Sequence, residues 1–405
     1  MYTAERNPLP TAAGVRQAVV RLAVLGPVLI VSLALALMIA TRLNEYHGNL
    51  AGFILFGRDY VRYTHPPGGA PVESPQGYDG QFYWIEANDP LLLRRATVAD
   101  MVGPAGYHFQ RPAYPALAYA LALGRRSALP VSMLAVNVLA ILGLTLGLAL
   151  FCRRRGWSVW WSLAVGALPG LLMPALRDLT DPLATAMMLG GLLAWYGRRR
   201  WGAAALLTIA VLAREPMAVA VVAILLDSIV SAWGARRDRA ALARTARFAW
   251  PSVVVPTVAY AAWQLYIRLA IPQIPGSVSV GVTAAPAGAL SLTGLAARIS
   301  PMLHGFGSLV SAWELVYVAL TAVALGVAVW LARRGGVAAL TALLCAATLT
   351  LIPFDDQWVL SRYTAPLFGA LLLAGLVERR SRAARAVCLA AAAASVFLPW
   401  VITGI

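Results

Sequence analysis

The sequence predicts an all-α polytopic membrane protein, a single domain over residues 1–405 with about 11 transmembrane helices and a long first outer loop. Composition is the first observation behind this fold class, because 60% of the residues are hydrophobic and only 12% are charged. Soluble domains are about a quarter charged. Apolar stretches of about 18 or more residues, long enough to cross a bilayer, recur along the chain. The third observation is an uneven distribution of arginine between alternate loops.

All 33 basic residues are arginine, and their distribution is typical of a membrane protein rather than a nucleic-acid-binding one. In the topology expected here, 20 arginines and 4 acids fall on one side of the membrane, and 13 arginines and 13 acids on the other. An excess of arginine marks the cytoplasmic side. We therefore expect a cytoplasmic N terminus, membrane lipids as neighbours and no nucleic-acid partner.

The first apolar segment, Val19–Ala40, exceeds the roughly 7–15 residues of a secretory signal and predicts an uncleaved helix. An outer loop over 41–127 follows, in which Pro112–Gly124 is apolar but too short to span, so it is expected at the interface or re-entrant. A second outer loop, rich in proline and glycine, covers 272–307. The later helices are expected at Leu129–Phe151, Trp157–Leu176, Pro182–Tyr196, Trp201–Ala213, Pro216–Trp233, Phe248–Ile271, Ser308–Ala332, Val337–Phe354, Thr364–Val377 and Ala386–Thr403.

Two of these helices, Pro182–Tyr196 and Trp201–Ala213, are shorter than the about 20 residues needed to span, and their outer ends carry charge. Such ends are expected below the outer surface, in a water-filled cavity. The chain has no Walker, Rossmann or zinc-site pattern, and its three cysteines have no paired spacing. No cofactor and no metal is therefore expected.

The segment Gly77–Tyr83 carries the most distinctive pattern, one carboxylate between two glycines and beside aromatic rings. A carboxylate at a bilayer surface suits a general base that activates a sugar hydroxyl. Asp79 is therefore the candidate catalytic residue, with Tyr78, Gln81 and Tyr83 as candidate substrate contacts. The alternative is an exposed loop aspartate without function.

Four further clusters lie on the same expected face. Gln110 and Arg111 suit a phosphate, although an arginine at an interface commonly snorkels to a headgroup. Arg177 precedes Asp178 and Asp181, which share a face if helical; Asp181 capping a helix before Pro182, or a metal contact, are the alternatives.

The remaining two clusters follow later apolar segments. Arg214 and Glu215 end a short membrane helix, where a charge is costly unless paired or wet, so a structural ion pair is an equal alternative to a functional one. Arg362 suits a lipid-linked phosphate, whereas Asp355 and Asp356 either bind substrate hydroxyls or cap a loop.

Several of these runs together resemble a family. The runs 78–83 and 109–115 resemble the pattern YDGQFYY…RYQRxLYPxL, 177–184 looks like RDLTEPLA, 212–216 is similar to LTRET, and 263–266 also fits. The pattern belongs to GT-C-like bacterial membrane proteins associated with cell-surface glycopolymer formation. The order and spacing hold across nearly the whole chain. Departures include His108 and Phe109 in place of Arg-Tyr, which removes a positive charge beside Arg111, and Asp181 in place of Glu, which keeps the acid.

The resemblance implies a GT-C-like bundle and a glycosyltransferase at the outer face of the inner (plasma) membrane. Its donor would be a polyprenyl-phosphate sugar, and its acceptor a cell-envelope glycan or glycolipid. Asp79 would deprotonate the acceptor, and Arg111, Arg214 or Arg362 would hold the departing phosphate. The alternatives are a transporter or flippase of a lipid-linked sugar, or a non-catalytic partner in glycan assembly.

Four stretches are expected to meet in one outer cavity, because charges on helices too short to reach bulk water are stabilised by mutual pairing. They are Asp79, Arg111, the turn 177–181, and Arg214 with Glu215. Arg177 or Arg214 is expected to neutralise one of the acids.

Overall fold

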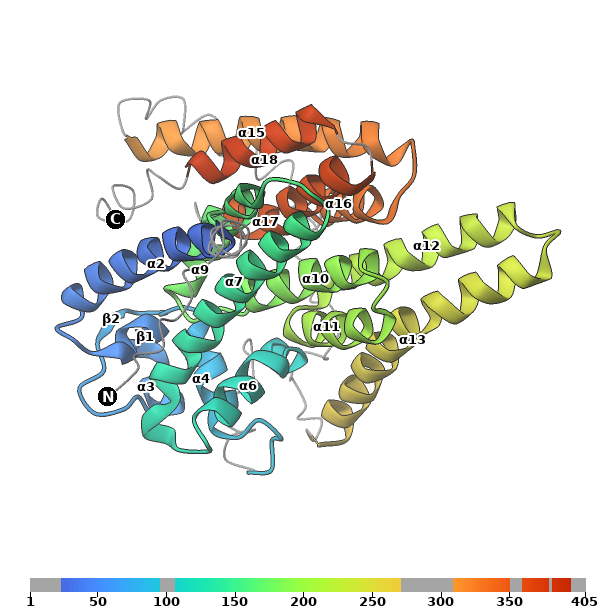
Figure 1. Cartoon of the computed structure of the whole chain (residues 1–405). Coiled ribbons are helices and arrows are strands. Elements are labelled where there is room, and N and C mark those ends of the chain that lie inside the picture. The colour runs from blue at the N-terminus through green and yellow to red at the C-terminus, as the bar shows by residue number, and fades with distance from the viewer. Residues whose placement is uncertain (1–22, 95–105, 271–308, 350–358, 379–380, 395–405) are drawn as a thin grey trace, which may run out of the picture.

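The computed structural model describes residues 23–94, 106–270, 309–349, 359–378 and 381–394. These residues form helices around one apolar core, with a single pair of very short strands (Figure 1). The elements in chain order are α2 (Leu25–Glu45), η1 (Leu50–Ile54), β1 (Phe56–Gly57), η2 (Arg58–Tyr60), α3 (Val61–Thr64), β2 (Val72–Ser74), α4 (Gly80–Asn88), η3 (Gly106–Gln110), α6 (Ala113–Leu121), η4 (Arg126–Ala128), α7 (Leu129–Arg154), η5 (Val159–Ser162), α8 (Leu163–Gly166), α9 (Pro169–Ala175), α10 (Asp181–Tyr196), α11 (Arg200–Ala213), η6 (Glu215–Met217), α12 (Ala218–Gly234), α13 (Arg239–Ala270), α15 (Leu309–Ala332), α16 (Val337–Thr348), α17 (Val359–Leu373), the π-helical η8 (Ala374–Glu378) and α18 (Arg382–Ala393).

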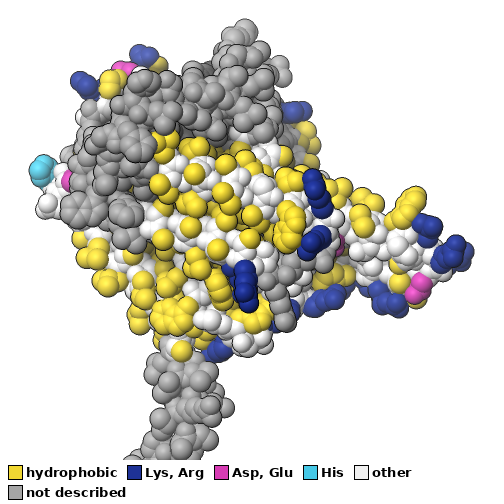
Figure 2. Space-filling view, turned by 90° about the horizontal axis from the view of Figure 1, so that it is seen from above, with side chains coloured by type: hydrophobic (Ala, Val, Ile, Leu, Met, Phe, Trp, Pro, Cys, Tyr) yellow, Lys and Arg dark blue, Asp and Glu magenta, His cyan; other side chains and the backbone are white. Residues whose placement is uncertain are grey.

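Five of the described helical stretches are long and apolar enough to cross a membrane, and they divide into central and peripheral ones. The stretch of α17 is mostly buried in the protein and that of α7 about half buried, whereas 28% or less of the residues are buried in those of α2, α12 and α15. Figure 2 shows a broad apolar surface on one face of the molecule. Exposed leucine, isoleucine and valine side chains on α2 and α12 suit contact with lipid. The expected all-α membrane fold is thus confirmed, whereas the count of 11 spans is not.

The segment expected as one helix over 157–176 is broken into η5, α8 and α9. Leu168 has an extended backbone because it precedes Pro169, which opens α9. Gly170 then packs so closely against the Ser361 carbonyl that a Cβ there would meet the oxygen. The break in the helix therefore allows α9 to pack closely against α17.

Helix boundaries differ from expectation at other places as well. The helix expected to begin at Phe248 begins at Arg239, so α12 and α13 form a long hairpin whose end projects from the body (Figure 1). The helix expected at 364 already begins at Val359 as α17, which places Arg362 inside its first turns. The loop 272–307 lies outside the described residues.

The described part of the 41–127 segment folds into a compact layer rather than an extended loop. Its strands β1 and β2 pair in parallel, and the Phe56 and Trp84 rings pack edge to face, with their centres 5.9 Å apart. The Trp84 ring nitrogen also donates to the Thr64 carbonyl at 2.9 Å. The expected interfacial segment is α6, which packs on α7 and α4. This layer positions the Gly77–Tyr83 segment against the membrane helices.

The charge asymmetry makes a prediction about orientation that cysteine labelling tests. Gly68 is exposed with open space around it, unlike its strained neighbour Gly69 at φ +75°, and Arg239 is exposed at the start of α13. We expect a membrane-impermeant thiol reagent, added to intact cells, to label Gly68→Cys but not Arg239→Cys. The native cysteines are buried and give a low background. Labelling of both variants after permeabilisation is the control, and the reverse pattern on intact cells inverts the assigned orientation.

Candidate functional site

Asp79 precedes the first turn of α4 and is brought there by two close-packed glycines. Gly77 has φ +65°, a left-handed conformation that favours glycine. At Gly80 a Cβ would lie 2.7 Å from the Arg177 carbonyl oxygen and 2.8 Å from that of Ile54. The two glycines that flank Tyr78 and Asp79 in the sequence therefore allow this segment to touch two backbones at once.

Replacing Gly80 with alanine is expected to destabilise the protein by about 1–3 kcal/mol, because the added methyl group meets backbone atoms that cannot rotate away. The same change separates α4 from the 177 turn and displaces Asp79. A lowered midpoint of thermal unfolding measures the effect. The control is Gly143→Ala in α7, where a Cβ meets nothing within 4 Å and alanine favours the helix. Equal midpoints for the two variants would contradict the prediction.

The Asp79 carboxylate lies between a histidine and an arginine. Its Oδ1 is 3.5 Å from Nε2 of His108, and its Oδ2 is 3.4 Å from Nη2 of Arg362. Burial alone would raise the pKa of the Asp79 carboxyl, but the hydrogen bond and charge of His108 and the charges of Arg362 and Arg111 lower it below its ordinary value. The carboxylate is therefore ionised, and about a quarter of its side chain is exposed.

Asp181 lies deeper than Asp79 and bridges two arginines. Nε of Arg362 donates to its Oδ2 at 3.0 Å, and Arg214 forms an ion pair with its Oδ1. The Arg214 guanidinium also lies over the Tyr363 ring, 4.3 Å from its centre. These side chains are nearly inaccessible, with 3% of Asp181 and 2% of Arg214 exposed. Asp181 is the first residue of α10, and no side chain caps that helix, so ion pairing replaces the expected cap.

Arg111 and Glu215 form a further ion pair. Arg111 donates from Nε and Nη2 to the two Glu215 oxygens, at 2.9 and 2.7 Å, and from Nη1 to the Tyr83 hydroxyl at 3.1 Å. The side chain of Glu215 is 34% exposed, so this pair borders solvent. Trp263 of α13 fixes the segment before Arg111 by donating to the Phe109 carbonyl at 2.7 Å.

The structure thus brings five separated stretches into one network. Arg362 bridges Asp79 to Asp181, and Arg214 joins Asp181 from the end of α11. Arg111 lies close enough to influence the Asp79 carboxyl. The convergence agrees with the expectation, including neutralisation of an acid by Arg214. The charges balance, because the network contains three arginines and three acids, namely Arg111, Arg214, Arg362, Asp79, Asp181 and Glu215.

Asp178 and Glu86 are buried acids that lie outside these ion pairs. Asp178 turns the chain between α9 and α10 at φ +48°, a conformation that aspartate tolerates. Its Oδ1 is 3.4 Å from the Tyr114 hydroxyl, and burial raises the pKa of its carboxyl well above the ordinary value. Burial likewise raises the pKa of Glu86 in α4. Burial thus favours the protonated form of both carboxyls, and Asp178 does not share partners with Asp181.

The other predicted contacts have varied surroundings. The buried Gln81 side chain accepts from the Gly57 N–H at 3.0 Å and donates to the Gln76 carbonyl at 2.7 Å, so it holds the loop. Tyr83 is buried behind Arg111, and Gln110 is half-buried. Asp355 and Asp356 lie outside the described residues.

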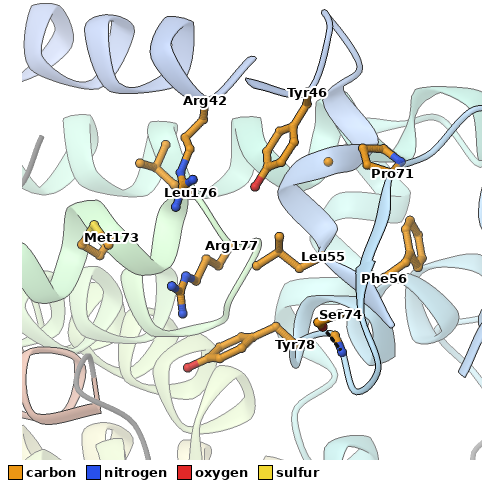
Figure 3. Close-up of a pocket in the computed structure, with 12 residues that line it drawn as sticks. Arg42, Tyr46, Leu55, Phe56, Pro71, Ser74, Tyr78, Met173, Leu176 and Arg177 are labelled. Atoms are coloured by element: carbon orange, nitrogen blue, oxygen red, sulfur yellow. Dashed lines mark hydrogen bonds between the residues drawn. The ribbon is translucent and has the colours of Figure 1, made fainter. Parts of the chain in front are cut away.

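A cavity of about 300 Å³ adjoins the network on the other side of Tyr78 (Figure 3). Arg177 lies over the Tyr78 ring, 4.9 Å from its centre, and Arg362 donates to the Tyr78 hydroxyl at 3.2 Å from the network side. The cavity is bounded by the end of α2, the 52–78 layer and the end of α9, through residues that include Arg42, Tyr46, Phe56, Ser74, Met173 and Leu176.

Comparison with protein-family models, with curated proteins and with solved structures finds no match for this chain. No three His, Cys, Asp or Glu side chains come together as a metal site within the described residues. The functional proposal therefore rests on the geometry of the network and its cavity.

Three residues of the site were missed by reasoning from the sequence. His108 was considered only as a position at which the family pattern has an arginine, yet it contacts Asp79. Tyr363, next to Arg362, lies under Arg214. Arg42 lines the cavity from the end of α2, where it was only one more basic residue of the loop. The position of Tyr363 directly after Arg362 in the sequence was a signal for it, whereas no local pattern indicates Arg42.

Proposed function

We propose that this protein is a glycosyltransferase that moves a sugar from a polyprenyl-phosphate donor to a cell-envelope glycan or glycolipid at the outer face of the membrane. The observation that carries the proposal is the state of Asp79. It is ionised and partly exposed, and its two contacts are long, at 3.4 and 3.5 Å. A carboxylate held in this way can accept a proton from an incoming hydroxyl.

The other two acids of the network are less suited to that role. Asp181 is enclosed between Arg214 and Arg362. Glu215 is partly exposed, but both of its oxygens accept short hydrogen bonds from Arg111. Asp79 is therefore the acid most readily freed for proton transfer.

In the proposed reaction the acceptor hydroxyl oxygen attacks the anomeric carbon as Asp79 removes its proton. The bond between that carbon and the phosphate oxygen breaks, and polyprenyl phosphate leaves with the electron pair. Arg362 lies next to Asp79, so its guanidinium group can stabilise the negative charge that develops on the leaving phosphate. Helices with exposed apolar faces, such as α2, give the lipid tail a place beside the site.

The rival is a transporter or flippase that binds the same lipid-linked sugar without chemistry. Transporter sites lie near the midplane, between related halves. Here the charged network gathers where α10 and η6 begin and α11 ends, which are neighbouring helix ends. This placement favours chemistry at one surface.

The test is to incubate the purified full-length protein with polyprenyl-phosphate sugars and a crude envelope acceptor, and to measure release of polyprenyl phosphate by mass spectrometry. Release that depends on Asp79 supports transfer. Binding of the donor without release, in protein that is folded and supplied with acceptor, supports the transporter and overturns the proposed reaction.

A further inference from the structure

The cavity behind Tyr78 is lined by two arginines that approach from different elements. Arg42 comes from the last turn of α2, and Arg177 from the turn after α9 (Figure 3). The described residues that line the cavity include no carboxylate. Arg42 pairs with Glu45 of its own helix at 2.5 Å, but Glu45 is not among those lining residues. The lining thus offers two guanidinium groups, one of them paired outside the cavity with Glu45, and no carboxylate.

The network on the other side of Tyr78 has a different balance. Each of its three arginines already contacts a carboxylate, and an added anion would have to displace one of these carboxylates. Two guanidinium groups lining one cavity repel each other, and an anion between them relieves that repulsion. An anion in the cavity would meet no lining carboxylate, whereas in the network it would meet three.

We propose that the cavity lined by Arg42 and Arg177 binds an oxyanion group, a phosphate or a carboxylate, carried by a saccharide or lipid-linked substrate. Guanidinium groups recognise both oxyanions through paired hydrogen bonds. Tyr46, Phe56 and Tyr78 supply aromatic rings, and the volume of about 300 Å³ suffices for a charged group with one sugar ring attached. Tyr78 separates this anion from Arg362 and Asp79 and holds it next to the proposed reaction centre.

The role of this site in transfer rests on the proposed function, but anion binding is measured without it. The protein in nanodiscs is titrated with glucose 1-phosphate, glucuronate, dodecyl phosphate and uncharged glucose. We expect the anionic probes to bind more tightly than glucose, with an affinity that falls as salt rises. Arg42→Gln and Arg177→Gln should each weaken anion binding about tenfold, the loss of one charge-assisted contact.

The control variants separate this role from folding and from catalysis. Arg125→Gln removes an exposed arginine elsewhere in the same 41–127 segment and should leave anion binding unchanged. Arg177→Lys should recover part of the affinity because it keeps the charge. Asp79→Asn should not weaken anion binding, because Asp79 does not line the cavity, so a failed catalytic role and a failed anion site give different results.

The probes also identify the source of the anion. Tightest binding of dodecyl phosphate indicates the lipid phosphate of the donor, whereas tightest binding of glucuronate indicates an acidic glycan. Either result supports the site. The proposal is overturned if glucose binds as tightly as the anions, or if both arginine variants unfold at the wild-type temperature and bind the anions unchanged.

Discussion

Asp79→Asn is expected to lower sugar transfer by about 10²–10⁴-fold, the usual contribution of a general base, while the protein still inserts and folds. The amide keeps the size of the carboxylate but cannot accept the proton of the acceptor hydroxyl. Its effect on stability should be small, because the contacts of Asp79 with His108 and Arg362 are long and partly exposed. The measurement is release of polyprenyl phosphate per folded molecule, with thermal unfolding recorded in parallel.

Asp59→Asn is the matched control, because Asp59 is an exposed aspartate in the same layer of the structure. It should retain transfer. Full activity of Asp79→Asn removes the catalytic role of this residue, and with it the main support for an enzyme over a non-catalytic partner.

The surroundings of Asp79 add a pH dependence to this prediction. His108 and the two arginines hold the pKa of Asp79 below its ordinary value, so the base stays ionised as the pH falls until that lowered pKa is reached. His108→Gln removes part of this effect and raises the pKa. The acidic limb of kcat/KM should therefore move to higher pH, with less change near neutrality. A parallel loss at every pH would instead indicate that His108 only supports the local fold.

The sequence predicted that charged residues of the network meet, but not all of the partners that they take. Charged residues at the ends of short apolar segments must pair or meet water, so Arg177 or Arg214 was expected to neutralise one of the acids, and Arg214 pairs with Asp181. The free-energy cost of burying a charge does not specify which residue will pair with it. Arg362, from a distant helix, bridges Asp79 and Asp181, and no local pattern specifies which helix supplies that arginine.

For the fold as well, the class was predicted from the sequence but the details were not. Hydropathy identified the membrane helices as a class, yet it did not reveal that 157–176 is broken where Leu168 precedes Pro169, or that Gly170 packs on Ser361 far along the chain. Gln81 was another such case, since its amide holds two loop backbones and only a folded loop shows this. Tertiary contacts of this kind are not encoded in local periodicity.

Asp181→Asn is expected to be the most destabilising conservative change in the network, by about 3–5 kcal/mol. Removing this one carboxylate leaves Arg214 and Arg362 buried together without the anion that they share. Glu215→Gln should cost less, although it leaves Arg111 without its carboxylate, because Glu215 is 34% exposed and water can replace part of the contact. The midpoint of thermal unfolding in one detergent ranks the two variants.

Asp238→Asn completes the series as the surface control. Asp238 pairs with Arg244 at 3.8 Å, both side chains are largely exposed, and an exposed pair contributes about 0–1 kcal/mol. The expected order of destabilisation is Asp181, then Glu215, then Asp238, which follows the depth of the cation left behind. A double variant, Asp181→Asn with Arg214→Met, should recover part of the loss because it removes one of the two stranded charges. Equal effects for the three single variants would contradict this order, as would no recovery in the double variant. Either result would mean that water reaches the network and that its charges do not depend on pairing with one another.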